Sequence, residues 1–210
     1  MFHIPEESVE IYKHIYLKDE YRIASVASEI DVFIDLGANI GCASKKAIDC
    51  GIKKIIAVEC GPIVFETLEK NMEEHRKDHE IVLLNSFATG KNFPFNSNIN
   101  NRNKEMQLID DIIEEHSDKR IFLKIDIEGG EYFVLRSMND NGQINIPKYI
   151  RGEFHSFNFD NEEHDISMKI EKNEDVFEFF SSLDREFSFP EYEKKFDYVL
   201  GSFMDLGIKE

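Results

Sequence analysis

The sequence predicts an α/β fold with a parallel central sheet covered by helices on both faces, and two observations carry this prediction. Short apolar runs alternate along the chain with segments whose apolar residues recur at the spacing of a helix. Such alternation is typical of parallel sheets, because each strand must return through a crossover helix. In addition, the apolar run over 32–36 leads directly into a glycine turn, Gly37-Ala-Asn-Ile-Gly41, and then into a helical segment.

Each element rests on its own local pattern. Runs of Ile, Val, Leu and Phe indicate buried strands. Recurring apolar positions indicate helices, with Gly51 after one helix and Pro62 in the first turn of the next. The asparagine-rich stretch 91–103 has no periodicity and is expected to be a loop. In chain order we expect one or two helices within 6–30, a strand at 32–36, a helix at 42–50, strands at 55–58 and 81–84 with a helix at 62–72 between them, a helix at 106–113, a strand at 121–127, a helix at 131–138, a strand at 149–154, a helix at 176–183, and two closing strands around 187–189 and 196–200.

The length and composition indicate one domain. At 210 residues with 41% hydrophobic content, the chain can bury a good core and is short for two domains. We expect an N-terminal helical segment over residues 1–30, a ligand-binding core over 31–155, and a C-terminal part over 156–210 that closes the sheet.

The charge and the cysteines narrow the functional class. A net charge of −17 argues against a nucleic-acid partner, because phosphate binding needs a basic surface. No apolar run is long enough to span a bilayer, and the first residues lack the pattern of a signal peptide. Three cysteines (Cys42, Cys50 and Cys60) without a C-x-x-C pair are expected to be reduced thiols in a cytoplasmic protein. The sequence gives no oligomeric state.

The glycine turn and the acid after the second strand indicate a nucleoside site. Glu59 follows the apolar run over 55–58, and an acid at that point can accept hydrogen bonds from two ribose hydroxyls. The turn is not G-x-G-x-x-G, so the cradle for a pyrophosphate is missing. A nucleoside that carries a carboxylate fits better, and S-adenosylmethionine is such a molecule.

Four motifs in this order then resemble a known family. They are Phe33-Ile-Asp-Leu-Gly-Ala-Asn-Ile-Gly41, Ala57-Val-Glu-Cys-Gly-Pro62, Ile109-Asp-Asp111 and Leu123-Lys-Ile-Asp-Ile-Glu-Gly-Gly-Glu131. Together they resemble the FkbM-type branch of the class I S-adenosylmethionine-dependent methyltransferases, over about three-fifths of the chain. The resemblance implies a doubly wound, Rossmann-like sheet of seven strands, the last antiparallel, and O-methylation of a hydroxyl on a sugar, a glycan or a small metabolite. Cys60 and Gly130 stand where the family usually has proline and alanine.

The candidate site residues follow from these motifs. Cofactor binding is assigned to the acid and turn after the first strand, to the two later acids at strand ends, and to an aromatic residue past the third strand; these are Asp35, Gly37, Asn39, Gly41, Glu59, Phe87 and Asp126. A hydroxyl must lose its proton as it is methylated, so a general base is needed. The candidates for that role are Glu128, Glu153 and His155.

Three alternatives stay open. A divalent metal held by Asp126, Glu128, Glu153 and His155 is one, although their spacing matches no metal motif, and the preferred assignment has no metal. A ligand-binding or scaffolding domain without catalysis is the second. The third is an NAD-dependent oxidoreductase on the same half-fold. That function needs a pyrophosphate cradle, which the glycine turn of this chain lacks.

Overall fold

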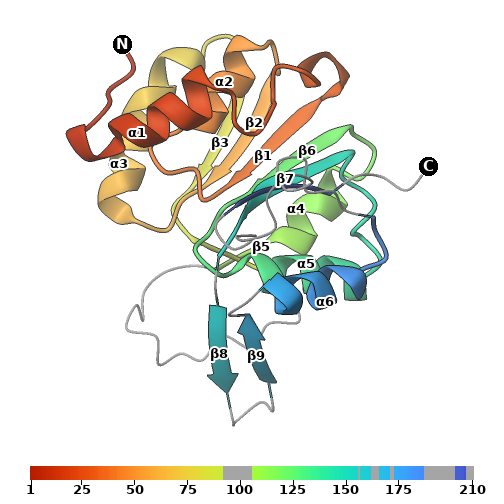
Figure 1. The fold of residues 1–210 in the computed structure, drawn as a ribbon. Coiled ribbons are helices and arrows are strands. Elements are labelled where there is room, and N and C mark those ends of the chain that lie inside the picture. Colours follow the sequence, from red (N-terminus) through yellow and green to blue (C-terminus); the bar gives the residue numbers. More distant parts are fainter. Residues whose placement is uncertain (92–105, 156, 162–165, 171–172, 187–201, 207–210) are drawn as a thin grey trace.

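A six-stranded sheet forms the centre of the molecule, and helices cover both of its faces (Figure 1). The computed structural model describes residues 1–91, 106–155, 157–161, 166–170, 173–186 and 202–206. The strand order is β10-β7-β6-β1-β2-β3, with β1 to β7 in this sheet parallel and β10 antiparallel to β7. The bounds are β1 Val32–Leu36, β2 Lys54–Val58, β3 Glu80–Leu84, β6 Ile121–Ile125, β7 Tyr149–Phe154 and β10 Ser202–Leu206.

This sheet confirms the α/β class with a parallel core and corrects the strand count. The described sheet has six strands, where seven were expected. The predicted strands around 187–189 and 196–200 lie outside the described residues. The strand predicted over 121–127 ends at Ile125, so the two residues that follow it leave the sheet at its carboxyl edge.

The two faces of the sheet bury two separate apolar clusters. One cluster joins alternate strand residues to α2 (Cys42–Asp49), α3 (Pro62–Met72) and the N-terminal segment. The other joins the opposite strand residues to α4 (Ile109–Glu115), α5 (Glu131–Asp140) and α6 (Asn173–Ser181). Burial on both sides explains why the strands read as continuous apolar runs.

The N-terminal segment differs from its prediction. Residues 6–17 form one helical stretch that changes type, from η1 (Glu6–Ser8, 3₁₀) through α1 (Val9–Ile11) to η2 (Tyr12–Leu17, a π-helix). Of the one or two helices expected within 6–30, one is present: after Asp19, which has φ 54°, the described chain makes turns and one short 3₁₀ helix, η3 (Ala27–Glu29). The apolar residues there follow no helical stripe, because they pack directly onto the sheet.

Two further pairs of strands were missed or misassigned. Met106 begins β5 (Met106–Leu108), which pairs with β4 (Phe87–Thr89), so the predicted helix starts three residues later, at Ile109. The strands β8 (Phe157–Asn161) and β9 (Ile166–Ile170) form an antiparallel pair that projects from the body in Figure 1. The remaining short helix is η4 (Glu73–His75). None of the helices within the described ranges has both the length and the apolar character that crossing a bilayer needs.

The strand order also locates the ligand edge of the sheet. The chain builds β1, β2 and β3 outward to one side and then returns to place β6 on the other side of β1. In open α/β sheets such a reversal leaves a crevice at the carboxyl ends of the strands, and ligands bind there.

Candidate active site

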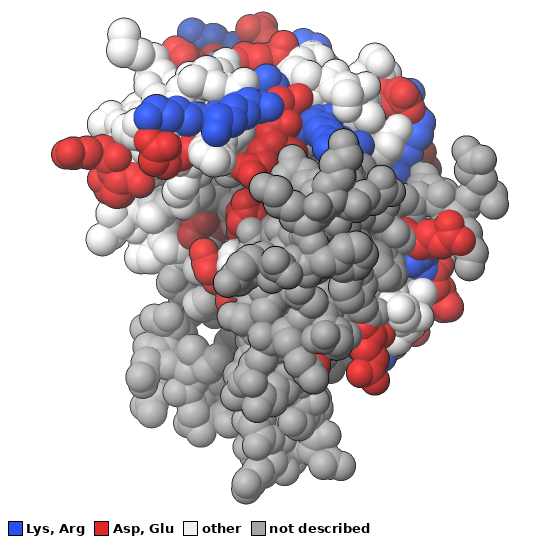
Figure 2. All heavy atoms as spheres, viewed as in Figure 1, with Lys and Arg blue, Asp and Glu red and all other residues white. Residues whose placement is uncertain are grey.

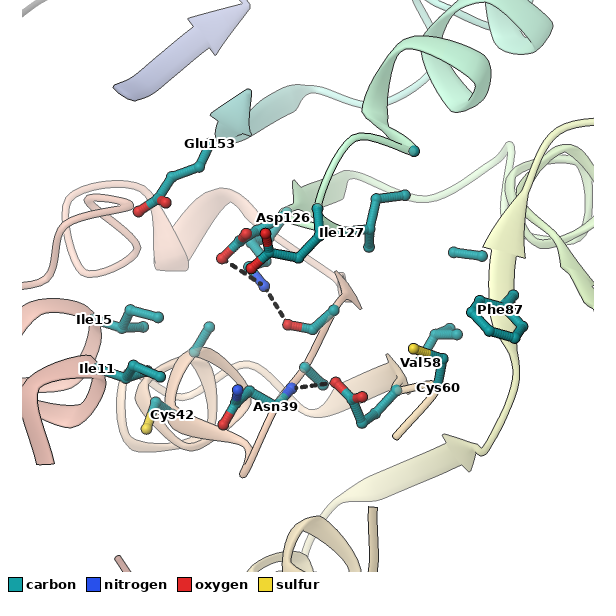
Figure 3. Close-up of a pocket in the computed structure, with 18 of the residues that line it drawn as sticks. Ile11, Ile15, Asn39, Cys42, Val58, Cys60, Phe87, Asp126, Ile127 and Glu153 are labelled. Carbon is teal, nitrogen blue, oxygen red and sulfur yellow. Dashed lines mark hydrogen bonds and ion pairs between the residues drawn. The ribbon is translucent and has the colours of Figure 1, made fainter. Parts of the chain in front are cut away.

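A cavity of about 940 Å³ opens at the carboxyl ends of β1, β2 and β6. In Figure 3, Val58, Cys60 and Phe87 lie at one end of it and Ile11, Ile15 and Cys42 at the other. Seven of the ten predicted site residues line it, namely Gly37, Asn39, Glu59, Phe87, Asp126, Glu128 and Glu153. Asp35, Gly41 and His155 do not belong to the lining, so their direct contact with a ligand stays a prediction.

The glycine turn is packed against the end of β6. Gly37 and Gly41 have φ values of 74° and 91°, and Asn39 adopts the same left-handed region with φ 51°. A Cβ on Gly37 would lie 1.7 Å from the backbone oxygen of Asp126, so only glycine allows this approach. Gly41 instead faces Leu68 behind the turn, which explains its absence from the cavity wall.

Glu59 connects the second strand to this turn. Its Oε2 accepts a hydrogen bond from the backbone N–H of Asn39 at 2.9 Å, and its Oε1 accepts one from Gly61 at 2.6 Å. A carboxylate offers about four lone-pair sites, so both oxygens can still accept hydroxyl hydrogen bonds from the cavity. The side chain is therefore fixed in place and remains able to accept further hydrogen bonds.

Asp35 holds the turn from below and does not reach the cavity. It is fully buried, and its Oδ2 accepts hydrogen bonds from the backbone N–H and the hydroxyl of Ser44, at 3.1 and 2.7 Å. These bonds cap the first turn of α2, where an acid is favourable. Its Oδ1 lies 3.2 Å from Lys124 Nζ.

Lys124 is a buried cation that was given no role in the sequence analysis. Its Nζ donates hydrogen bonds to the backbone oxygens of Leu36 and Gly37, at 3.1 and 2.6 Å. Burial alone would lower the pKa of Lys124, but the carboxylates of Asp35 and Asp126 outweigh burial and raise it. Burial of a lysine inside the apolar run over 121–125 is unfavourable unless its charge is paired. The unusual position of Lys124 in this run was therefore the feature of the sequence that could have indicated its role.

Asp126 lies between the turn and the N-terminal segment. Its Oδ2 accepts a hydrogen bond from the hydroxyl of Tyr21 at 2.9 Å, and Lys124 Nζ is 3.7 Å away. Burial and the nearby Asp126 carboxylate raise the pKa of the Tyr21 hydroxyl well above its usual value, so that hydroxyl stays a donor. No pattern in the sequence joins residues this far apart in the chain.

His155 is hydrogen-bonded to a buried glutamate. Its Nδ1 lies 3.0 Å from Glu131 Oε1, and Glu131 is fully buried while it also accepts backbone N–H bonds from Ile127 and Gly129. The hydrogen bond to Glu131 is the largest cause that raises the pKa of His155 to about 9. An imidazole that already carries its proton at neutral pH cannot accept another, so the predicted role of His155 as a base is not supported.

The two remaining base candidates differ in exposure. The Glu128 side chain is 86% exposed and the Glu153 side chain 28%. Burial, followed by the nearby Asp126 carboxylate, raises the pKa of Glu153 to about 7. Of the two, Glu153 has the proton affinity that suits a base at neutral pH.

The end of the cavity near Phe87 contains an unsatisfied hydroxyl. Ser86 is 5% exposed, lines the cavity, and its Oγ has no hydrogen-bond partner in the part of the chain that is described. Buried hydroxyl groups usually have a partner, so this one points to a ligand or a water molecule. Ser86 could not be identified from the sequence, because a serine before a short strand is common and does not indicate a ligand site.

The N-terminal segment forms the opposite wall, which the sequence analysis also missed. Ile11 and Ile15 point into the cavity in Figure 3, and Glu10, His14 and Glu20 belong to the same wall. The π-helix over Tyr12–Leu17 passes along this wall, and such distortions are frequent at functional sites.

A metal ion can be considered at one group of side chains. Asp126, Glu131 and His155 each offer a ligand atom within 4.8 Å of the others. A metal would have to displace the proton that His155 shares with Glu131, and Glu131 already accepts two backbone N–H bonds. The alternative set with Glu128 and Glu153 places their oxygens 3.7 and 4.0 Å from His155 Nε2.

Comparison with known proteins gives one family. Residues 35–189 match the family model described as the methyltransferase FkbM domain, which is more than half of the chain. No curated protein sequence matches this chain at a significant level.

Similar solved structures are distant. The METTL16 MTase domain shares 16% identity, covers 65% of this chain and 50% of its own, and has a TM-score of 0.42. The Pyrococcus abyssi tRNA (uracil-54, C5)-methyltransferase, solved with S-adenosyl-L-homocysteine, shares 9%, covers 90% and 37%, and has a TM-score of 0.42. P. horikoshii TYW2, solved with MeSAdo, shares 16%, covers 91% and 61%, and has a TM-score of 0.43. The chain matches 37 to 61% of the length of these three structures.

Proposed function

This chain belongs to the family of methyltransferase FkbM domains, and we propose that it transfers a methyl group from S-adenosylmethionine to a hydroxyl of a sugar, a glycan or a small metabolite. The observation that carries the proposal is the cavity in which Glu59, the glycine turn and Asp126 line one continuous space. S-adenosylmethionine supplies, when bound, a methyl carbon made electrophilic by the adjacent sulfonium.

The residues at the Phe87 end fit an adenosine. Glu59 accepts hydrogen bonds from the two ribose hydroxyls with the lone pairs that Asn39 and Gly61 leave unused. Phe87 flanks the adenine ring, and the Ser86 hydroxyl, which no described residue hydrogen-bonds, gains a partner there. The orphaned buried oxygen is the feature that favours a polar heterocycle over a purely apolar ligand at this end.

The residues around Asp126 fit the charged part of the cofactor. Gly37 is in direct contact with the backbone of Asp126, so a ligand that extends from Glu59 across the turn reaches the Asp126 carboxylate. Tyr21 and Lys124 fix that carboxylate in an orientation where it can face an ammonium or sulfonium group.

Glu153 takes the proton of the acceptor hydroxyl. At neutral pH a carboxyl with a pKa of about 7 is partly ionised, and it holds a proton well enough to accept one from a hydroxyl as the oxygen is methylated. Positioning of the hydroxyl and exclusion of water by Ile11 and Ile15 supply the remaining acceleration. The non-catalytic alternative lacks a reason for a carboxyl with this raised pKa beside the cavity.

Calorimetry with S-adenosylhomocysteine tests the binding step. We expect the wild type to bind and Glu59→Ala to weaken binding by about 1.5–3 kcal/mol, because charge-assisted hydrogen bonds to two hydroxyls are lost. Glu66→Ala is the matched control, since Glu66 is an exposed acid on α3 that does not line the cavity. Absence of binding by the wild type, or an equal loss in both variants, would contradict the proposal.

A further inference from the structure

The far end of the cavity, beyond Asp126, carries an excess of negative charge. Besides Asp126 itself, the carboxylates that line it there are Glu10, Glu20, Glu128 and Glu153. They come from three separate parts of the fold: the N-terminal segment, the turn after β6, and β7. Their convergence on one space is therefore a property of the tertiary structure and not of one acidic stretch.

Nearby cations balance only part of this charge. Lys13 pairs with Glu10 at 2.6 Å, and His155 Nε2, outside the lining, lies 3.7 Å from Glu128 and 4.0 Å from Glu153. Among the described residues that line the cavity, Lys124 is the sole lysine or arginine. Its Nζ already donates hydrogen bonds to the backbone oxygens of Leu36 and Gly37 and is ion-paired with Asp35. His14 also lines the cavity, and its Nδ1 lies 3.7 Å from Glu20 Oε2. Neither side chain offers an unengaged cation to an incoming anion.

The raised pKa of Glu153 reflects, besides burial, the repulsion among these same carboxylates. After burial, the largest causes are the carboxylates of Asp126 and Glu20, which oppose the ionisation of Glu153. A negative group of a ligand placed at the same point would meet the same repulsion.

A second observation indicates that this cavity holds a ligand and is not merely an acidic surface. Ser86 is 5% exposed, and its hydroxyl has no hydrogen-bond partner within the described ranges; it lines the same cavity, next to Phe87. A ligand anchored there and extending past Glu59 and Asp126 brings its reactive end toward Glu153.

We propose that the methyl acceptor is a neutral or amine-bearing hydroxyl compound, and that Glu20, Glu128 and Glu153 reject acceptors that carry a phosphate or a carboxylate near the reacting hydroxyl. This inference rests on the proposed function and names the chemical class of its acceptor. The apolar side chains of Ile11 and Ile15 leave room for the carbon face of a sugar ring or a similar polyol. Sugar phosphates, nucleotide-linked sugars that react close to the phosphate, and uronic acids are excluded as acceptors.

Three analogues of S-adenosylmethionine test the charge preference without a known acceptor. In each, a nitrogen replaces the sulfur, and the methyl group is extended into a short arm that ends in an amine, a hydroxyl or a carboxylate. The common adenosine and amino-acid parts anchor all three, so the arm alone reports on the acceptor end. We expect calorimetry to give affinities for the amine and hydroxyl arms about tenfold or more above that for the carboxylate arm, because like charges brought together are strongly disfavoured.

Two variants and one control assign the effect to the named residues. Glu20→Gln and Glu153→Gln should each reduce the ratio of the affinity for the amine-arm analogue to the affinity for the carboxylate-arm analogue. Glu66→Gln should leave this ratio unchanged. Circular dichroism of each variant verifies that it is folded, and Glu20 is a rim residue whose replacement disturbs little of the core. A carboxylate arm that binds as tightly as the amine arm in the wild type would overturn the inference. Failure of S-adenosylhomocysteine and of all three analogues to bind would instead overturn the proposed function.

Discussion

Two neighbouring ionisable residues, Glu153 and His155, differ in pKa because their partners differ. Glu153 is half-buried near other carboxylates, which raises its pKa to about 7. His155 is hydrogen-bonded to the buried Glu131, which raises its pKa to about 9. One group can therefore accept a proton at neutral pH while the other keeps its own. The sequence named both as candidates, and only the contacts with distant residues separate them.

Replacement of the proposed base gives a prediction for activity. We expect Glu153→Gln to lower kcat by about 10²–10⁴, the usual contribution of a general base, with little change in the affinity for S-adenosylhomocysteine. In the wild type, activity should rise with pH through about 7, because only the ionised carboxyl accepts the proton. Steady-state rates against pH measure both effects. A variant that keeps the wild-type pH profile would assign the base to another residue.

Replacement of the charged histidine gives a prediction for stability. The pKa of His155 is raised from 6.5 to about 9, so its stabilising contribution is fully present below about pH 6.5 and is lost as pH rises through about 9. We expect His155→Gln to lose about 2 kcal/mol of unfolding free energy relative to the wild type near pH 6, and much less near pH 10.

Urea unfolding at the two pH values measures this difference. His79→Gln is the control, since the His79 ring is hydrogen-bonded to the backbone carbonyl of His75 and has no carboxylate partner among the described residues. An equal loss for His155→Gln at both pH values would contradict the raised pKa of His155.

At the scale of elements, the glycine turn and the ends of β1 and β6 form one unit. Asp35 and Lys124 are partners in the sheet register, and their side chains join the start of α2 to both strands. The sequence predicted the turn and the acids, because their positions after apolar runs are local signals. It did not predict the role of Lys124, which depends on the pairing of two strands far apart in the chain.

A pair of glycine replacements tests how tightly this unit is packed. Gly51→Ala places a methyl group in open space, so we expect only the cost of its left-handed backbone, about 1 kcal/mol. Gly37→Ala carries the same backbone cost and also drives the methyl group against the backbone oxygen of Asp126, so we expect about 3 kcal/mol or more.

Thermal unfolding and S-adenosylhomocysteine binding measure both variants. Gly37→Ala should lose binding in addition to stability, while Gly51→Ala should bind like the wild type. Equal losses in the two variants would mean that the turn does not press against β6.

At the scale of the whole molecule, the sequence predicted more of the fold than of the site. Alternating apolar runs predicted the five parallel strands and the helices α2, α3, α5 and α6, because these patterns are local. The N-terminal segment was predicted as regular helices, and it is instead an irregular wall whose residues contact the cavity. Irregular backbone is fixed by tertiary packing, which periodicity does not encode.

The distribution of charge also belongs to this scale. Figure 2 shows acidic and basic side chains interspersed on the described part of one face. The net charge of −17 favours solubility of the molecule and repels anions in general. Among the acids of the cavity, Asp126 and Glu153 have side chains only 20% and 28% exposed, and this partial burial strengthens their effect on a ligand.

A crystal structure with S-adenosylhomocysteine tests whether the cavity at the ends of β1 and β2 holds an adenosine. We expect both ribose hydroxyls to lie within hydrogen-bond distance of the Glu59 carboxylate, with the sulfur closer to Asp126 than to Phe87. An adenosine bound outside this cavity, or a Glu59 carboxylate that contacts no ribose oxygen, would contradict the proposed mode of cofactor binding.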